Sequence, residues 1–276
     1  KDVDDKIEII PAHCLTPWFG LYGSKSGFDS LKDCFKDKVK NIYAIESGMS
    51  ADPMMLWRFK ESVNIVSFSD AHSFWPWRLG RESTIFDFKD LSYESLIKAI
   101  RTGDGLSSTI ETIPAYGKYH WDGHRNCGIS FDPKKTKELD GICPKCKKNL
   151  TIGVDYRVEE LAKEPYGYKP KNTKGFVCLI PLHELIAVVY DINQLGSKKV
   201  WEIYNKLVSE FGNEFNVLLN ASYENLVKVV NEKVAKIIMD NRKGNLKIKP
   251  GFDGEYGKII LEGKDKIIKQ KTLGEF

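Results

Sequence analysis

The sequence SDAH at positions 69–72 most strongly constrains what this chain can fold into. It follows the apolar run NIVSF at 64–68, whose composition predicts a buried β-strand. An Asp and a His two residues apart at the carboxyl end of a strand can reach one point. There they offer an oxygen and a nitrogen ligand to a divalent metal. The sequence therefore predicts a metal-ligating strand end.

Two earlier segments repeat this arrangement. His13 comes just after the apolar residues 7–10, and Glu46 follows the apolar residues 42–45, so each would stand at the end of a strand. Active sites of (β/α) barrels are built at the carboxyl ends of the strands, so these positions indicate an α/β fold of that kind. The four candidate catalytic and metal-ligating residues are His13, Glu46, Asp70 and His72.

The segment 16–27, TPWFGLYGSKSG, combines aromatic residues, glycines and a lysine. Aromatic rings stack on bases and glycine allows close approach of the backbone, so a loop over a nucleic-acid site is one interpretation. An aromatic lid packed on the barrel rim is the other. The candidate substrate-binding residues are Trp18, Phe19, Tyr22, Ser24 and Lys25, with Arg81 in a later loop.

Two pairs of potential zinc ligands are spaced alike. His124 and Cys127 are separated by two residues, as are Cys143 and Cys146. This spacing lets both members of a pair reach one tetrahedral ion, and four protein ligands make a closed site, so we expect a structural Zn²⁺. His120 is the alternative fourth ligand. Lysines and aromatic residues surround the pairs, which fits either contact with DNA or a solvated charged face.

The last third is predicted to be mainly helical. Amphipathic patterns or caps indicate helices at 181–190, 198–210, 222–230 and 232–241. Segments 245–249 and 258–261 flank a Gly-rich loop and predict a β-hairpin, whose Phe252 and Tyr256 either stack on DNA or pack back. The segment 264–271 is basic. With the Pro- and Gly-rich connector at 165–175 as a boundary, we expect three domains, 1–110, 111–170 and 171–276.

Composition adds only broad limits. A hydrophobic fraction of 42% and a net charge of +4 are ordinary for a globular protein, and the charge permits a nucleic-acid partner without requiring one. No apolar run approaches membrane-spanning length and no secretory signal is present, so we expect a cytoplasmic protein without a membrane partner.

Several longer motifs resemble one known group of proteins. They are PAH-x-x-TPWFG-x-x-GSKSGFDSL, AIESGMSADP, FSDAHS, YH-x-DGHRNCG, CPKC, VEELA and PGFDGEYGKI. Together they resemble PHP-type phosphoesterases, and most closely the endonuclease Q family, over nearly the whole chain. The aromatic loop and the cysteine pairs make this resemblance far more specific than SDAH alone.

The resemblance implies the C-terminal part of a PHP-type distorted (β/α) barrel with a multinuclear metal centre. It implies cleavage of DNA 5′ to a deaminated base (uracil, hypoxanthine or xanthine) or an abasic site, with Zn²⁺, Mg²⁺ or Mn²⁺ at the barrel site. By motif, His13, Asp70 and His72 match metal ligands, and Glu46 matches a carboxylate in or beside the site.

One part of the family pattern has no counterpart here. The family opens with an H-x-H strand and further ligands before the PAH segment, and only twelve residues precede His13. We therefore expect that an N-terminal PHP half-domain completes this one. It could be a second polypeptide, it could have been removed from this chain, or the sequence could be a fragment of a longer one. A PHP phosphatase acting on a small phosphoester and a non-catalytic DNA-binding module are the alternative functions.

Overall fold

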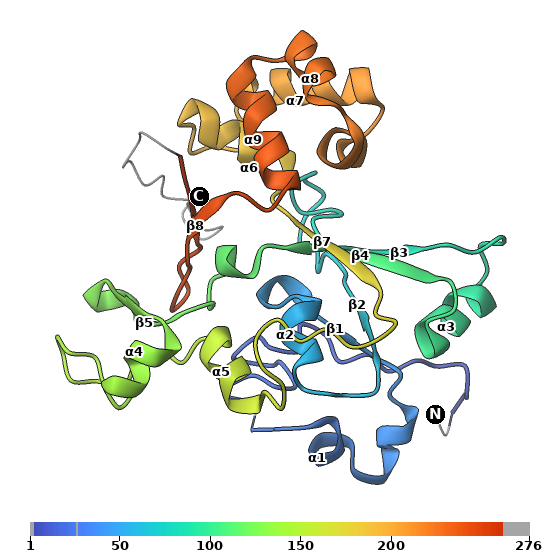
Figure 1. Cartoon of the computed structure of the whole chain (residues 1–276), viewed down its shortest axis with the longest axis vertical. Helices are drawn as coiled ribbons and strands as arrows, with labels where there is room; N and C mark the ends of the chain where they lie inside the picture. Colours follow the sequence, from blue (N-terminus) through green and yellow to red (C-terminus); the bar gives the residue numbers. More distant parts are fainter. Residues whose placement is uncertain (1–2, 26, 262–276) are drawn as a thin grey trace. The chain divides into compact units, whose positions relative to one another are not determined.

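The computed structural model describes residues 3–25 and 27–261, and the basic segment 264–271 lies outside them (Figure 1). The described chain divides into two compact units. The first consists of residues 3–70, 82–177 and 250–257, and the second of residues 71–81, 178–249 and 258–261. Among the described residues, no helix is long and apolar enough to cross a membrane.

The first unit contains a pair of short parallel strands, in which Ile45 is in register with Ile65. Side chains alternate between the two faces of a strand. Ile45 packs with Leu56 of helix α2, and Ala44 packs with Ile100 of helix α3, so the two helices cover opposite faces of the pair. Burial of both faces explains why these strands are continuously apolar.

A three-stranded sheet and a smaller pair complete the strands of this unit. The sheet has the order β3-β4-β7, with β3 and β4 antiparallel, and β5 pairs with β6. The strands are β1 (Ala44–Glu46), β2 (Asn64–Val66), β3 (Ser83–Phe86), β4 (Leu106–Thr112), β5 (Asp122–His124), β6 (Ile129–Phe131) and β7 (Gly175–Leu179), which continues into the second unit. The α-helices are α1 (Leu31–Phe35), α2 (Pro53–Trp57), α3 (Tyr93–Thr102), α4 (Pro133–Glu138) and α5 (Val154–Leu161), with 3₁₀ turns at Lys36–Asn41, Gly48–Ser50, Pro114–Tyr116 and Arg125–Cys127.

The strand predicted at 7–10 is wrong. This segment has no strand pairing, and its neighbour Pro11 makes a single bond in which its carbonyl accepts from the N–H of Glu46 at 3.0 Å. A ladder needs successive bonds, so His13 stands on a loop that runs beside β1. The first α-helix is short, because the chain continues as a 3₁₀ turn after Phe35.

The second unit contains the predicted helices and hairpin. Ser197 caps α7, where Val200, Ile203 and Leu207 are buried on one face. The side chain of Asn241 both donates to and accepts from the main chain of Ile180, which ties the start of α6 to α9. The elements are α6 (Leu182–Tyr190), α7 (Lys198–Phe211), a π-helical turn (Asn216–Asn220), α8 (Tyr223–Val229), α9 (Glu232–Arg242) and the antiparallel strands β8 (Lys247–Lys249) and β9 (Lys258–Ile260).

The loop between β8 and β9 belongs to the first unit. Phe252 is 8% exposed, and a Cβ on Gly123 would lie 2.4 Å from its ring, so Phe252 packs back on strand β5. Tyr256 lies near Tyr116, with ring centroids 6.5 Å apart. Of the two interpretations of Phe252, packing is the one that the structure supports.

Candidate functional site

Glu46 is the last residue of β1 and is only 5% exposed. Its Oε2 accepts a 2.6 Å hydrogen bond from the main-chain N–H of His13. Burial raises the pKa of Glu46, an effect that the N–H groups of His13 and Phe68 partly offset and that the nearby charge of Asp70 reinforces. Two of the other three candidate residues, His13 and Asp70, therefore act on this buried carboxylate.

The backbone at two of these positions is unusual. His13 has φ of 33° and Asp70 has φ of 44°, in the left-handed region that non-glycine residues seldom occupy. His13 lies at a bend of the chain, and Asp70 comes four residues after the end of β2. Backbone outliers of this kind often mark functional sites.

The donor set at this place suits a divalent metal only in part. The Nδ1 atom of His13 is buried and has no hydrogen-bond partner among the described residues, so a metal ion would satisfy it. One imidazole with the carboxylates of Glu46 and Asp70 is a ligand set for Zn²⁺ or Mn²⁺. Their ligand atoms do not, however, form a close group of three within the described part of the chain. His72 follows in the second unit, where it is exposed.

A second buried carboxylate, which was missed from the sequence, is hydrogen-bonded to Ser47, the residue after Glu46. Glu111 on β4 is fully buried and accepts hydrogen bonds from the hydroxyls of Ser47, at 2.7 Å, and Thr109, at 2.5 Å. Burial raises the pKa of Glu111 to about 7, although the hydroxyl donors act in the opposite direction. The available signal was a single acidic residue inside the otherwise uncharged strand LSSTIET.

The candidate substrate-binding residues occupy different environments. Phe19 is 93% exposed, and Trp18 is half-exposed and makes an edge contact with Tyr119. Tyr22 is fully buried against Phe59, so its ring is enclosed by the protein. Ser24 donates to the carbonyl of Ile152 at 3.2 Å. The two remaining candidates are Lys25, which is exposed, and Arg81, which is partly buried in the second unit.

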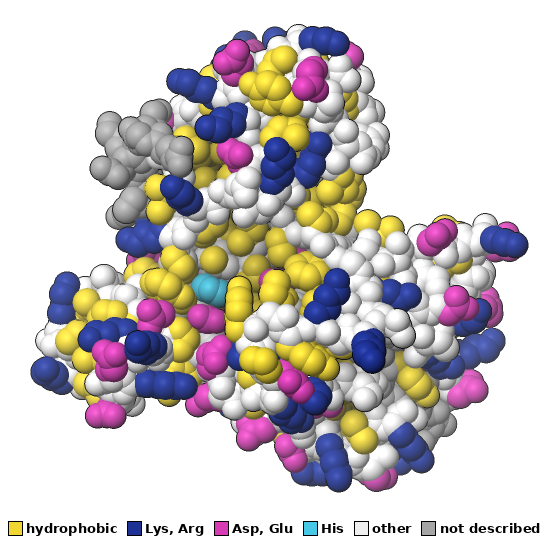
Figure 2. All heavy atoms as spheres, viewed as in Figure 1, with side chains coloured by type: hydrophobic (Ala, Val, Ile, Leu, Met, Phe, Trp, Pro, Cys, Tyr) yellow, Lys and Arg dark blue, Asp and Glu magenta, His cyan; other side chains and the backbone are white. Residues whose placement is uncertain are grey.

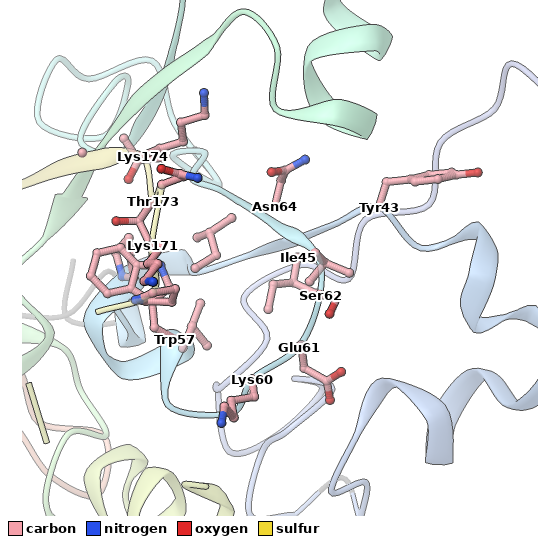
Figure 3. Close-up of a pocket in the computed structure, with 18 of the residues that line it drawn as sticks. Tyr43, Ile45, Trp57, Lys60, Glu61, Ser62, Asn64, Lys171, Thr173 and Lys174 are labelled. Atoms are coloured by element: carbon pink, nitrogen blue, oxygen red, sulfur yellow. The ribbon is translucent and has the colours of Figure 1, made fainter. Parts of the chain in front are cut away.

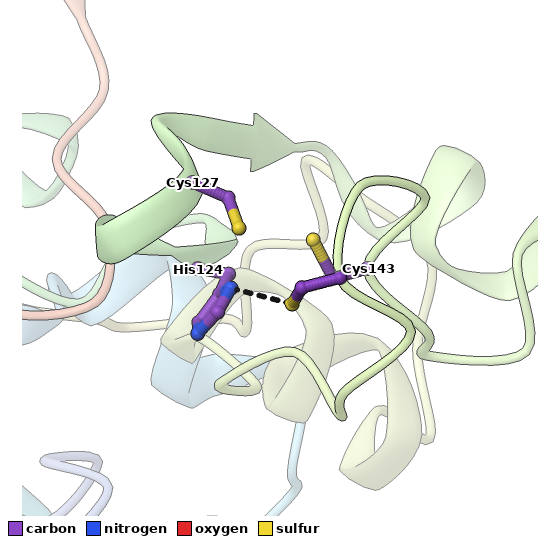
Figure 4. A group of neighbouring side chains, drawn as sticks. His124, Cys127 and Cys143 are labelled. Carbon is purple, nitrogen blue, oxygen red and sulfur yellow. Dashed lines mark hydrogen bonds between the residues drawn. The ribbon is translucent and has the colours of Figure 1, made fainter.

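The cysteine and histidine pairs form one compact cluster. One ligand atom from each residue lies within 4.8 Å of all the others, and Figure 4 shows the side chains converging. The Nδ1 of His124 is 3.2 Å from the Sγ of Cys146. The rival histidine, His120, is not in this group, and burial lowers its pKa to about 4. The residues that the structure brings together are His124, Cys127, Cys143 and Cys146.

Electrostatics within the cluster suit a cation. Burial acts to raise the pKa of Cys143 and is the largest single effect, but the N–H groups of Cys146 and Lys145 lower it to about 6. Burial and the neighbouring thiols raise the pKa of Cys127 to about 11. The pKa values of these two thiols are thus shifted in opposite directions. A bound metal ion would favour the thiolate form of both, because thiolates are the ligands that it binds.

The basic residues around the cluster are dispersed. On the face shown in Figure 2, Lys and Arg side chains lie interspersed with Asp and Glu. Some of these cations already contact the protein: Lys145 donates to the carbonyl of Cys127 at 2.8 Å, and Lys118 lies over the ring of Tyr256. On that face, nucleic-acid contact would involve individual cations rather than one continuous basic patch.

A pocket of about 560 Å³ opens at the other end of the β1–β2 pair (Figure 3). Tyr43 and Asn64, at the amino ends of the two strands, line it together with Trp57 and Lys171. Glu46 lies at the carboxyl end of β1, so the pocket and the buried carboxylate are at opposite ends of the pair.

Comparison with known proteins places these features in a wider context. The family model described as the MJ0043 C-terminal domain matches residues 181–245. The uncharacterized protein MJ0043 of Methanocaldococcus jannaschii is 35% identical over 257 residues, which are 91% of this chain and 32% of that protein. The uncharacterized protein YqxK of Bacillus subtilis is 32% identical over 256 residues, which are 91% of this chain and 60% of that protein. The chain thus spans 32% and 60% of the lengths of these two relatives.

Two solved structures give the class: the chain has the fold of a lesion-specific DNA endonuclease. The crystal structure of the endonuclease PfuEndoQ from Pyrococcus furiosus matches 93% of this chain and 63% of its own chain, with 37% identity and a TM-score of 0.82. That of endonuclease Q with a 27-mer duplex carrying an abasic lesion at the active site matches 98% of this chain and 66% of its own, with 36% identity and a TM-score of 0.81. The resemblance to endonuclease Q is thereby confirmed.

Proposed function

We propose that this chain is part of a metal-dependent endonuclease that cleaves DNA on the 5′ side of a deaminated base or an abasic site. The observation that carries this proposal is the agreement with PfuEndoQ, at 37% identity and a TM-score of 0.82 over 93% of the chain. A second endonuclease Q structure holds a duplex with an abasic lesion, which makes damaged DNA the natural partner to test.

His13, Glu46 and Asp70 would hold a divalent ion, Zn²⁺, Mg²⁺ or Mn²⁺, beside the scissile phosphate, with His72 as a further ligand. Such an ion supplies a bound water of lowered pKa as nucleophile. The chain's own contribution is positioning: Glu46 holds the N–H of His13 and thereby fixes the bend that carries the imidazole. Burial keeps the carboxylate from exchanging that bond for one to water.

The cluster of His124, Cys127, Cys143 and Cys146 would hold a structural Zn²⁺. Four protein ligands leave no open position for substrate, so this ion would stabilise the surrounding module. In this proposal residues 1–110 form the C-terminal part of a PHP-type barrel, residues 111–170 form the zinc module, and residues 171–276 help to hold the duplex.

The barrel ligands of this chain would be completed by an N-terminal PHP half-domain. Three observations support this: only part of a ligand set is gathered around Glu46, the chain spans 63% of PfuEndoQ, and Ile7 and Ile9 are more than 40% exposed. Exposed apolar side chains on a folded unit are typical of a surface that another segment covers.

A nicking assay tests the proposed function. The chain is assayed on end-labelled duplexes carrying uracil, hypoxanthine or an abasic site, with Mn²⁺ or Mg²⁺, alone and mixed with the N-terminal half of a homologous endonuclease Q. We expect incision 5′ to the lesion only in the mixture and not on intact duplex. Hydrolysis of histidinol phosphate with no incision of any lesion would overturn it in favour of a phosphatase.

A non-catalytic DNA-binding module is the second candidate. The observation that favours it is that His13, Glu46 and Asp70 do not gather their ligand atoms as closely as the cysteine cluster does. Elemental analysis separates the two: one zinc per chain and none bound by the reconstituted barrel would support the binding module.

A further inference from the structure

The segment 71–81 of the second unit presents a row of aromatic rings that the sequence analysis did not single out. The rings of Phe74 and Trp75 have centroids 4.8 Å apart. Trp75 stacks in turn on Trp77, with centroids 5.1 Å apart and planes within 4° of parallel. The sequence FWPW therefore folds into a continuous stack rather than three separate side chains.

The inner end of this stack is anchored on two helices. Trp77 contacts His183 of α6 and Trp201 of α7, at centroid distances of 4.8 and 6.3 Å. His183 is fully buried, and its ring lies 3.9 Å from that of Tyr204. Burial lowers the pKa of His183 to about 4, so near neutral pH this ring is uncharged and packs as an aromatic plane.

Exposure rises steadily toward the outer end. Trp77 is 7% exposed, Trp75 39% and Phe74 75%. Large exposed apolar rings are unfavourable in water, and a contiguous exposed group of them is typical of a binding surface. Because the rings are already held in place, a planar partner could be added at little cost in side-chain entropy.

The charge of this loop points to the kind of partner. Residues 71–81 include Arg78 and Arg81 and no acidic residue. Planar rings beside cations suit a nucleic acid, since a base has a flat π-face and is joined to a phosphate. Stacked rings with two arginines in the same loop therefore favour a nucleic acid over a protein partner.

We propose that Phe74 and Trp75 form a stacking platform for a DNA base that has lost its stacking neighbour at a lesion. The inference rests on the proposed function and specifies how damage is sensed: an abasic site leaves an unfilled gap in the base stack, and the outer rings of this loop fill it. Intact duplex offers no such gap, so the platform contributes to discrimination rather than to general affinity.

The test compares binding by the full chain, without catalytic metal, to fluorescently labelled abasic and intact duplexes of the same sequence. Replacing both rings (Phe74→Ala with Trp75→Ala) should weaken binding to the abasic duplex roughly tenfold to a hundredfold, the range expected from losing one stacked base. Binding to the intact duplex should change less than about twofold. Trp75→Phe, which keeps a ring, should retain the preference.

Tyr223→Ala is the matched control, because Tyr223 is an aromatic residue of the same unit, is 38% exposed and lies outside the stack. It should leave both affinities unchanged. Phe74→Ala alone removes a mostly exposed side chain, so it reports on binding even if the double variant is destabilised. Quenching of 2-aminopurine beside the abasic site, present with the wild type and lost in the double variant, gives an independent readout of stacking.

Equal weakening on both duplexes, no weakening, or the same effect from Tyr223→Ala would overturn the platform while leaving the nuclease proposal intact. A wild-type dimer that becomes monomeric in the double variant would assign this surface to a second copy of the chain and overturn it too. Failure of the wild type to bind either duplex would instead refute the proposed function, and the platform with it.

Discussion

The main-chain N–H of His13 donates a 2.6 Å hydrogen bond to the Oε2 of Glu46, 33 positions further along the chain. This bond joins the bend that carries the imidazole to the last residue of β1. The carbonyl of Glu46 in turn accepts from the N–H of Cys14 at 3.1 Å, so Glu46 holds the loop through both its side chain and its main chain. The position of the imidazole thus depends on a buried carboxylate.

Asp70→Asn should abolish incision by the reconstituted enzyme while sparing the fold. The left-handed backbone at this position, with φ of 44°, is one that Asn adopts readily, so this local conformation should survive. Loss of the negative charge removes a metal ligand, and we expect activity to fall by more than the ~10–100-fold typical of residues that only support a ligand. The measurement is single-turnover nicking of abasic duplex.

Asp104→Asn is the control for that experiment, because Asp104 is an exposed carboxylate paired with Lys98. It should leave nicking unchanged. If Asp70→Asn retained wild-type activity, Asp70 would have no role as a ligand.

Cys143→Ala should release the structural metal and unfold the surrounding module. Cys143 is fully buried and contributes one of four converging ligands, and in zinc-finger peptides the bound ion supplies an apparent ~10–16 kcal/mol of folding free energy. The zinc content measured by elemental analysis should fall from one ion per chain to nearly none, and the melting temperature should be lower. Cys34→Ala, outside the cluster, should keep its zinc; zinc retained by Cys143→Ala would show that another residue binds it.

Some of the fold could be predicted because its causes are local. Ser92, Ser197 and Ser222 each accept a hydrogen bond from an N–H one turn into the following helix, as an N-cap does. Helices α7 and α8 accordingly begin where the sequence indicates, and the same kind of cap marks the start of α3.

The remainder depends on contacts between distant segments. Residues 7–10 have the composition of a strand but gain no ladder, because a strand also needs a partner that the pattern cannot identify. Glu111 could not be recognised as a buried carboxylate without knowing that Ser47, 64 positions earlier, donates a hydrogen bond to it. The stack that links Trp77 to His183 likewise joins segments more than a hundred residues apart.

Glu111 should make the stability of the protein depend on pH in an identifiable window. Its pKa is about 7 in the folded state and near 4.5 when unfolded, so between these values the folded state holds the extra proton. Its contribution to the free energy of unfolding is therefore fully present below pH 4.5 and is lost as pH rises through 7, by up to about 3 kcal/mol.

Urea unfolding of the wild type and of Glu111→Gln, at about pH 5 and about pH 8, measures this effect. Glutamine does not titrate, so the variant should lose less stability than the wild type between the acidic and the alkaline pH. If wild type and variant differed in free energy of unfolding by the same amount at both pH values, Glu111 would not change its protonation in this range.

Gly251→Ala should destabilise the first unit by about 2 kcal/mol or more, or lower its melting temperature by roughly 4–8 °C. The N–H of Gly251 donates to the carbonyl of Ala115 at 2.9 Å, and its own carbonyl accepts from Trp121 at 3.0 Å. A Cβ here would lie 2.1 Å from the carbonyl oxygen of Gly117, a backbone atom that cannot rotate away.

Thermal melting checks this prediction, with Gly175→Ala as the control. A Cβ at Gly175 would meet nothing closer than 3.8 Å, so that substitution should change stability by less than ~0.5 kcal/mol. Equal melting temperatures for the two variants would show that the segment 250–257 does not need its close approach to Gly117.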